Sequence, residues 1–289
     1  MNVVAAQRFS KMHGAGNHFV VVDLRGGFEP APEWIRAVAD PCTGVGFDQL
    51  LGIEAARTPG AVAGFRIWNT DGSPARQCGN GARCVASWLR REGLQIGRDF
   101  VLDSPSGPLR VEVLDDGRFA VEMGRPDFAP TAIPFTAEAE APQYRRRLFD
   151  EVLSFGAVSM GNPHAVVEVA DAAATPVATL ATRLQGSGDF PDGVNVGFAQ
   201  VLAPDRIRLR VYERGVGETR ACGSGACAAV AVLVRRGRVG REVAVELPGG
   251  VLGVRWPQDD APVTLSGPTA FVFDGSFAAA FAAAAAPAR

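Results

Sequence analysis

One short motif occurs twice in this chain, and it constrains the fold more than any other feature. Residues 77–82 read QCGNGA and residues 221–226 read ACGSGA, so both copies contain C-G-x-G-A. The two copies are separated by about half of the 289 residues. A repeat at this distance indicates a chain built from two similar halves, and two domains fit within this length.

An apolar, alanine-rich run follows each copy of the motif, at residues 85–89 and 228–233. Each run ends in a pair of arginines and then a glycine, at residues 90–93 and 235–237. Basic residues in the last turn and a glycine stop are typical of the end of a helix. The cysteine of each motif is therefore predicted in a glycine-rich turn that opens a helix.

Around these helices the pattern is mainly that of β-strands. Residues 206–212 alternate apolar and charged side chains strictly, as a half-exposed strand does. Similar stretches at residues 109–114, 243–247 and 251–254 are separated by Gly and Pro turns. We therefore predict an α/β (α+β) fold of two pseudo-symmetric halves, related by a pseudo-twofold axis, with a cleft between them.

The predicted halves divide the chain near its middle. Residues 1–123 carry the first cysteine motif, and we expect a closing strand near residues 268–277 to join them. Residues 124–267 carry the second motif, and their first part, residues 124–142, is rich in proline and small residues and is predicted to be a hinge. Residues 278–289 are alanine-rich and read as a low-complexity tail.

The charge balance excludes several classes of partner. Lys and Arg total 29 against 31 Asp and Glu, which gives a formal net charge of −2. A chain so close to neutral lacks the basic footprint that nucleic acid or an anionic membrane attracts. No apolar run approaches the roughly 20 residues of a spanning helix, and the first residues lack the features of a secretory signal. We therefore expect a cytoplasmic protein.

Five cysteines are present, at Cys42, Cys78, Cys84, Cys222 and Cys227. Their odd number, in a chain without a secretory signal, argues against a disulfide framework and for free thiols. We interpret the two motif cysteines as functional. The other three are predicted to be packed thiols.

Two thiols at matched helix N-termini suggest chemistry on two faces of one carbon atom. A helix N-terminus favours the thiolate and lowers the thiol pKa, and its free N–H groups can bind a carboxylate. Racemisation fits this arrangement, because one group removes a proton from one face while its partner supplies a proton to the opposite face. Lys11 is the only lysine, so at most one residue could hold pyridoxal phosphate, and we predict no cofactor.

A zinc site is the competing use of four of these cysteines. Cys78 and Cys84 are close in sequence, as are Cys222 and Cys227, but structural zinc sites usually have tighter spacing, and we predict no metal. A non-catalytic zinc or thiol-redox protein therefore stays as a remote alternative.

Six blocks of sequence carry a resemblance to a known family. They are residues 9–17 (FSKMHGAGN), 69–73 (NTDGS), 77–84 (QCGNGARC), 159–164 (SMGNPH), 191–195 (PDGVN) and 213–225 (ERGVGETRACGSG). From Phe9 to about Phe273 the chain resembles the diaminopimelate epimerases. These are cofactor-independent two-thiol enzymes that interconvert LL- and meso-2,6-diaminopimelate on the route to lysine and peptidoglycan. The resemblance also implies a mixed or antiparallel β-roll around a central helix in each half, and a homodimer.

The resemblance further implies roles for residues at matching positions. Cys78 would be the proton donor and Cys222 the proton acceptor, with roles that exchange with reaction direction, while His164 and Glu213 would tune the thiol pKa values. The implied substrate contacts are Asn17, Gln49, Asn69, Gly79, Asn80, Asn162, Asn195, Glu213, Arg214, Gly223 and Ser224. Backbone N–H groups in both cysteine turns would hold the reacting carboxylate.

These contacts divide between the two ends of the substrate. Asn17, Gln49 and Glu213 would lie near the reacting amino end. The distal end would be read by Asn69, Asn162, Asn195 and Arg214. A guanidinium for a carboxylate and amide oxygens for an ammonium suit a zwitterionic distal centre.

The chain departs from the family pattern at three positions that bear on substrate preference. The family commonly has Asp where His18 stands, Ala where Phe47 stands and Ala where Thr70 stands. The alternative function is another amino-acid racemase or epimerase of this architecture, such as a histidine or proline type. The asparagine set together with Arg214 favours a substrate that has a second zwitterionic end.

Overall fold

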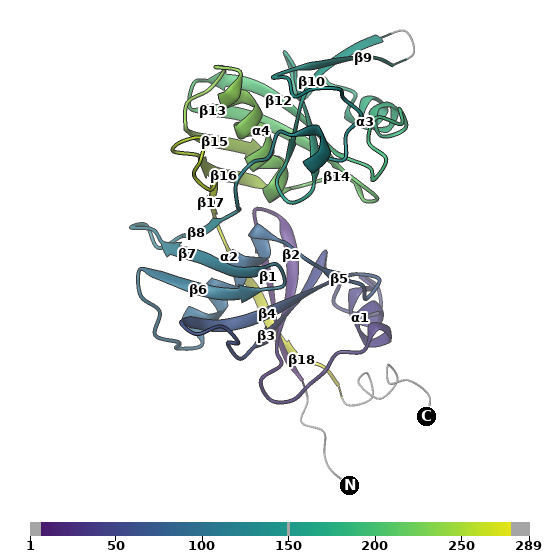
Figure 1. Ribbon diagram of the computed structural model, residues 1–289. Coiled ribbons are helices and arrows are strands. Elements are labelled where there is room, and N and C mark those ends of the chain that lie inside the picture. The colour runs from purple at the N-terminus through teal and green to yellow at the C-terminus, as the bar shows by residue number, and fades with distance from the viewer. Residues whose placement is uncertain (1–6, 149–150, 279–289) are drawn as a thin grey trace. The chain divides into compact units, whose positions relative to one another are not determined.

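The computed structural model describes residues 7–148 and 151–278, and these residues form two compact units (Figure 1). Unit 1 contains the described residues up to Val121 together with those from Pro268 onward, and unit 2 is Glu122–Gly267. The predicted low-complexity tail lies outside the described residues except at its first position.

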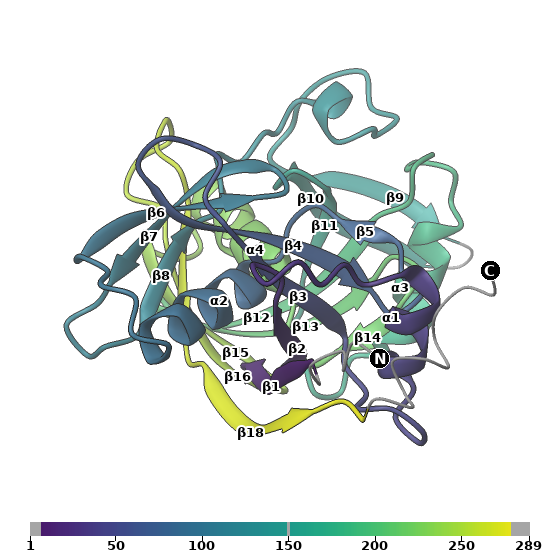
Figure 2. The ribbon, with the colours of Figure 1, turned by 90° about the horizontal axis from the view of Figure 1, so that it is seen from below.

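Unit 1 is a mixed β-sheet with two helices. Its strands are β1 (Arg8–Gly14), β2 (Asn17–Asp23), β3 (Gln49–Glu54), β4 (Ala61–Asn69), β5 (Pro74–Ala75), β6 (Asp99–Ser104), β7 (Gly107–Val113), β8 (Phe119–Glu122) and β18 (Ala270–Ser276), and its helices are α1 (Pro32–Ala39) and α2 (Gly79–Arg91). The strands pair in the order β18-β1-β2-β3-β4-β6-β7-β8, and of these pairs β2–β3 and β4–β6 are parallel. β18 lies beside β1 (Figure 2).

Unit 2 repeats this topology. Its strands are β9 (Tyr144–Leu148), β10 (Glu151–Ser159), β11 (Pro163–Glu168), β12 (Asn195–Ala203), β13 (Arg206–Glu213), β14 (Gly217–Thr219), β15 (Glu242–Leu247), β16 (Gly250–Arg255) and β17 (Thr264–Gly267), and its helices are α3 (Val177–Gln185) and α4 (Gly223–Arg235) with a 3₁₀ turn, η1 (Pro130–Ala132). The pairing order is β9-β10-β11-β12-β13-β15-β16-β17, with β11–β12 and β13–β15 parallel. Strand order and directions therefore match unit 1 element for element, which confirms the prediction of two pseudo-symmetric mixed-sheet halves.

The central helix of each unit is enclosed by its own sheet. Residues 79–89 of α2 are all buried, and residues 225–233 of α4 are buried as well. In unit 2 a glycine of the sheet allows a close approach of the helix: a Cβ on Gly156 of β10 would lie 2.4 Å from Cγ1 of Val232 in α4. Both helices end just before a left-handed glycine, Gly93 at φ 84° and Gly237 at φ 66°, as the sequence predicts.

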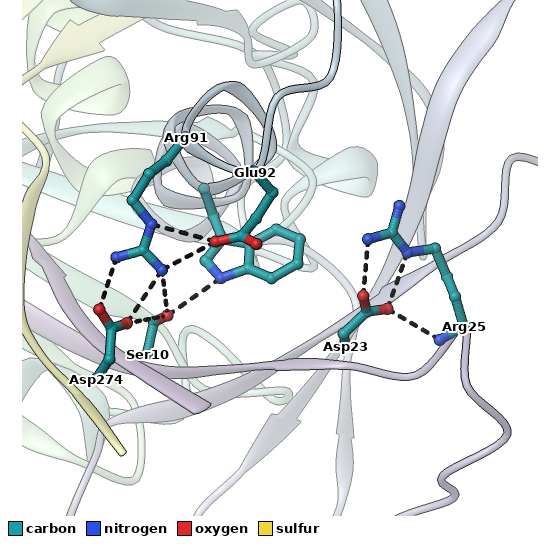
Figure 3. Close-up of polar contacts among 7 residues, drawn as sticks. Ser10, Asp23, Arg25, Arg91, Glu92 and Asp274 are labelled. Atoms are coloured by element: carbon teal, nitrogen blue, oxygen red, sulfur yellow. Dashed lines mark hydrogen bonds and ion pairs between the residues drawn. The ribbon is translucent and has the colours of Figure 1, made fainter. Parts of the chain in front are cut away.

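The C-terminal end of α2 is fixed to two strands by a polar cluster (Figure 3). The Arg91 guanidinium donates to both carboxylate oxygens of Asp274, at 3.0 and 3.1 Å, and to Oγ of Ser10 at 2.7 Å. The indole Nε1 of Trp88 also donates to Ser10 Oγ, at 3.1 Å. α2 is therefore anchored to β1 and β18 at the end remote from its cysteine.

The proline-rich segment 124–142 was predicted to be a hinge, but part of it belongs to the core of unit 2. Ile133 and Phe135 are buried in that core, and the Phe135 ring stacks on Phe190 with centroids 4.6 Å apart. Burial of two large apolar side chains explains why this stretch is held in place despite its loop-like composition.

Candidate active site

The two motif cysteines occupy equivalent positions, each as the N-cap residue of its unit's central helix. Cys78 precedes α2 and its Sγ accepts the Gly81 N–H at 3.2 Å. Cys222 precedes α4 and lies 3.7 Å, Sγ to Oγ, from Ser224. The second glycine of each motif leaves room for the sulfur, because a Cβ on Gly225 would lie 3.2 Å from Cys222 Sγ. The prediction that each thiol opens a helix is confirmed.

In unit 1, the predicted polar residues gather at the strand ends that face the Cys78 turn. Asn17 and Gln49 are the first residues of the parallel strands β2 and β3, and Asn69 is the last residue of β4. Gln49 pairs in register with Asn69, and its Nε2 donates to Asn69 Oδ1 at 3.2 Å. Asn17 Oδ1 lies 3.8 Å from Cys78 Sγ and accepts from Asn80 Nδ2 at 3.3 Å. The topology thus brings three separate sequence blocks to one helix N-terminus.

In unit 2, the equivalent strand ends hold the second predicted set. His164 pairs in register with Asn195 across the parallel strands β11 and β12, and its Nε2 lies 3.0 Å from Asn162 Oδ1. Asn195 Oδ1 accepts the backbone N–H of Arg214 at 2.9 Å. Glu213 ends β13 and accepts a hydrogen bond from Thr219 Oγ1 at 2.6 Å.

The environment of Cys222 changes one expectation. The sequence predicts a lowered thiol pKa at both helix N-termini, but burial raises the pKa of Cys222 well above its ordinary value, and the nearby Glu213 carboxylate raises it further. Ser224 and the N–H of Gly225 act in the opposite direction and are outweighed. In the free protein Cys222 therefore carries its proton at neutral pH.

Of the other three cysteines, two are buried as predicted and one is exposed. Cys84 and Cys227 are buried, as expected of packed thiols, and burial raises the pKa of Cys84. Cys42 is exposed, so its assignment as a packed thiol is wrong. The reason is local: Cys42 lies in an exposed turn after α1, where its backbone N–H donates to Asp40 Oδ1 at 2.7 Å.

His164 is neutral in the folded protein. Burial lowers the pKa of His164 to about 3, and the positive charge of Arg214 contributes in the same direction. Its imidazole therefore acts as a neutral hydrogen-bonding group toward Asn162 at physiological pH.

This burial predicts a pH dependence of stability. The folded pKa of His164, about 3, lies below the ordinary value of 6.5, so the unfolded chain binds this proton more readily between those values. The stabilisation is complete above about pH 6.5 and is lost as the pH falls toward about 3. Between pH 7 and pH 5, the free energy of unfolding of the wild type should fall by up to about 1.4 kcal/mol per pH unit more than that of His164→Gln. Urea denaturation at several pH values measures the free energy of unfolding, and His13→Gln is the control for loss of an imidazole. If the free energy of unfolding changed equally with pH in the wild type and in His164→Gln, the prediction would be contradicted.

The Arg214 side chain packs directly against a glycine of the preceding loop. Gly193 has φ +72°, and a Cβ there would lie 2.6 Å from Cδ of Arg214. The Arg214 guanidinium also donates to the backbone oxygen of Asp192. The loop before β12 therefore sets the direction of this side chain.

Gly193→Ala should displace Arg214. Since the family resemblance implies that Arg214 binds the substrate, the variant should reduce kcat/KM about tenfold or more, because small misplacements of a binding group are costly to turnover. Gly188→Ala is the matched control: Gly188 has φ +80°, but a Cβ added there would meet nothing within 4 Å, so this variant carries the backbone strain alone. Steady-state kinetics of both variants check this. Equal losses in the two variants would show that backbone strain, and not Arg214, is responsible.

Two further residues, which the sequence patterns did not indicate, contact the polar side chains next to Cys78. Asp48 precedes β3 and contacts Asn17, and Arg83 is a fully buried residue of α2 that contacts Asn80. The repeat could have indicated Arg83, because the two copies differ in charge at this position: the second copy has the uncharged Cys227 there. Asp48 had no such signal.

Two negative observations apply to the described residues, 7–148 and 151–278. None of their helices has both the length and the apolar character needed to cross a membrane. Their His, Cys, Asp and Glu side chains form no group of three or more that could hold a metal ion.

The two-unit fold is shared with solved proteins of low sequence identity. A solved hydroxyproline epimerase from Agrobacterium vitis superposes with a TM-score of 0.67 at 19% identity, covering 96% of this chain and 93% of that chain. The sequence profile named diaminopimelate epimerase matches residues 9–129 and 156–272. The chain belongs to the diaminopimelate epimerase family and is an isomerase.

Two curated relatives are similar over nearly the whole chain. A diaminopimelate epimerase of Xanthomonas axonopodis pv. citri (strain 306) is 58% identical over 272 residues, which cover 93% of this chain and 96% of the relative. An O-ureido-serine racemase of Streptomyces lavendulae is 57% identical over 271 residues, covering 93% and 94%. Two relatives of nearly equal similarity thus carry different substrate names.

Proposed function

We propose that this chain epimerises LL-2,6-diaminopimelate to meso-2,6-diaminopimelate without a cofactor. The observation that carries the proposal is the pair of thiols, Cys78 and Cys222, each at the N-terminus of an enclosed helix in two units of matching topology. Membership of the diaminopimelate epimerase family supports this substrate.

The thiols would act as the acid–base pair. One thiolate removes the α-proton from one face, and the opposite thiol delivers a proton to the other face; the roles exchange with reaction direction. Burial and Glu213 raise the pKa of Cys222 in the free protein, so Cys222 would have to lose its proton before it takes the acceptor role that the family resemblance implies. Backbone N–H groups of Gly79, Asn80, Gly223 and Ser224 would hold the reacting carboxylate, where negative charge develops as the carbanion forms.

The remaining polar residues would recognise the two ends of the substrate. We infer that Asn17, Gln49 and Glu213 lie near the reacting amino end. The distal zwitterion would bind to Asn69, Asn162, Asn195 and Arg214, of which Arg214 supplies the guanidinium for the distal carboxylate. His164 would support this set as a neutral partner of Asn162.

O-Ureidoserine is the second candidate substrate, favoured by the 57% identical relative named for it. Its reacting end is the same α-amino acid, but its distal end is an uncharged urea. A guanidinium would then have no carboxylate to bind. Arg214 thus separates the two candidates chemically.

The test is incubation of the purified protein in D₂O with each substrate in separate reactions and no added cofactor. We expect meso-diaminopimelate carrying deuterium at the inverted carbon, and slower or no inversion of O-ureidoserine. Inversion of O-ureidoserine alone would replace the proposed substrate with the second candidate. Failure to invert either compound under reducing conditions would overturn the proposal.

We also infer a homodimer and a cytoplasmic location. Exposed apolar side chains on β18, at Phe271, Val272 and Phe273, support an association surface in unit 1. Sedimentation equilibrium should give twice the mass of one chain, and a monomer at micromolar concentration would contradict the dimer.

The cytoplasmic location is supported by the cysteines. All five are free, as is usual for proteins of a reducing compartment.

A further inference from the structure

We propose that Asp48 is a positioning residue: it fixes the direction of the Asn17 side-chain amide, so that the carbonyl oxygen of this amide, and not its NH₂ group, faces Cys78. The inference deepens the proposed function, on which it rests only for the placing of Asn17 at the reacting amino group.

A directional chain of hydrogen bonds runs past Cys78 from a cation to an anion. Arg83 Nη2 donates to Asn80 Oδ1 at 2.8 Å. Asn80 Nδ2 then donates to Asn17 Oδ1 at 3.3 Å, and Asn17 Nδ2 donates to Asp48 Oδ2 at 2.7 Å. Cys78 Sγ lies beside the middle of this chain, 3.8 Å from Asn17 Oδ1.

The charges at both ends decide how the two amides point. A side-chain amide has nearly the same shape after a half-turn that exchanges its oxygen and nitrogen. A guanidinium can only donate and an ionised carboxylate can only accept, so Asn80 must turn its oxygen to Arg83 and Asn17 its NH₂ to Asp48. Only one orientation of each amide then makes all three hydrogen bonds, and the two bonds to charged groups are the stronger ones.

Both ends of the chain are held in place. Arg83 is fully buried and also donates to the backbone oxygen of Gly79 at 3.3 Å. Asp48 is half-exposed, but its Oδ2 accepts the backbone N–H of His18 at 2.9 Å and its Oδ1 lies 3.2 Å from His18 Nε2. On its other side the His18 ring contacts the Lys11 ammonium, 2.9 Å away.

The hydrogen-bond chain has charged residues at both ends, but the two matching positions of unit 2 are uncharged. The arrangement is therefore specific to the surroundings of Cys78. By the order of the elements, the residue before β3 in unit 1 is Asp48 and the residue before β12 in unit 2 is the buried Val194. The residue matching Arg83 is the buried Cys227. Cys222 has Glu213 and Ser224 near its sulfur instead.

The consequence is that an acceptor oxygen is presented to the space beside Cys78. Asn17 Oδ1 can accept the Cys78 S–H in the free protein or an ammonium of an amino-acid substrate. It opposes the thiolate, whereas the Gly81 N–H favours it. Without Asp48, the Asn17 amide loses its hydrogen bond to a charged group and keeps only the longer one from Asn80, so its NH₂ group can turn toward the thiolate.

The experiment measures alkylation of Cys78 by iodoacetamide across pH, followed by peptide mass spectrometry so that the exposed Cys42 is read separately. Asp48→Ala should lower the pH midpoint of Cys78 alkylation by about 0.5–1 unit, the size expected of one neutral hydrogen bond. Asp48→Asn keeps an acceptor oxygen without the charge, and it should leave the midpoint within about 0.3 unit of the wild type. Asp116→Ala, which removes an exposed carboxylate that pairs with Arg118 in the same unit, is the control and should change nothing.

The same measurement in an Asn17→Ala background tests whether Asp48 acts on Cys78 through Asn17. Asp48→Ala should cause no further shift in that background if it acts through Asn17. An equal shift in Asp48→Ala and Asp48→Asn would assign the effect to charge and overturn the proposal. So would an unchanged midpoint in Asp48→Ala, or a shift that persists without Asn17.

This test needs no substrate, so its result stands even if the protein does not epimerise diaminopimelate. Where the proposed function holds, Asp48→Ala should raise KM for diaminopimelate more than it lowers kcat, because the ammonium contact is present both in the bound substrate and in the transition state. Asp48→Asn should restore most of that loss.

Discussion

Replacing Cys78 or Cys222 by alanine should abolish measurable inversion of diaminopimelate. In the proposed mechanism each thiol serves one face of the α-carbon, and general acid–base catalysis by a positioned group contributes about 10²–10⁴-fold. Loss of either thiol would remove one of the two proton transfers that inversion requires. We therefore expect kcat to fall by at least about 10³-fold in each single variant, measured as deuterium incorporation into inverted product.

The appropriate control for these variants is Cys42→Ala. Cys42 is an exposed free thiol outside both helix turns, so its removal should leave kcat and KM unchanged. Cys84→Ala is less informative as a control, because Cys84 is fully buried and its loss creates a cavity. Retention of more than a tenth of wild-type activity in either Cys78→Ala or Cys222→Ala would contradict the two-thiol mechanism.

Replacing Arg214 by methionine should give the second largest effect. A hydrogen bond to a charged group contributes about 1.5–3 kcal/mol, so loss of the guanidinium should reduce kcat/KM for diaminopimelate roughly 10- to 150-fold. Arg214→Lys should recover only part of this, because an ammonium lacks the planar fork that matches a carboxylate. Steady-state kinetics on both variants give the comparison.

The same variant also tests the choice between substrates. O-Ureidoserine has no distal carboxylate, so Arg214→Met should change its turnover by less than about threefold. Arg206→Met, at the opposite end of β13, removes an exposed arginine without touching the site and serves as the control. Equal activity of wild type and Arg214→Met on diaminopimelate would remove Arg214 from substrate recognition.

Much of the fold could be predicted because its signals are local and occur twice. The C-G-x-G-A motifs placed Cys78 and Cys222 at helix starts, and strict alternation placed a strand at residues 206–212, where β13 is found. These features depend on turn chemistry and side-chain period, which short stretches of sequence carry by themselves.

The parts that escaped prediction depend on contacts between distant segments. The raised pKa of Cys222 comes first from burial, which only the folded chain shows; the family resemblance implies that Glu213 tunes a thiol pKa, but not that the pKa of Cys222 is raised. The polar link from Asn17 to Asp48 joins β2 to the residue before β3, across a helix and a long loop. Neither contact leaves a periodic or spaced pattern in the chain, so no window of sequence predicts it.

The pairing of β18 with β1 has a consequence for how the chain folds during synthesis. Unit 2 is one continuous segment, Glu122–Gly267, and all its strands are translated before β18. Unit 1 begins first but waits for its last strand, since β1 pairs on one side with Ala270–Ser276. Nascent unit 1 therefore has an unpaired strand edge at β1 for the whole time that unit 2 is being made, and an unpaired edge of this kind can pair with another chain.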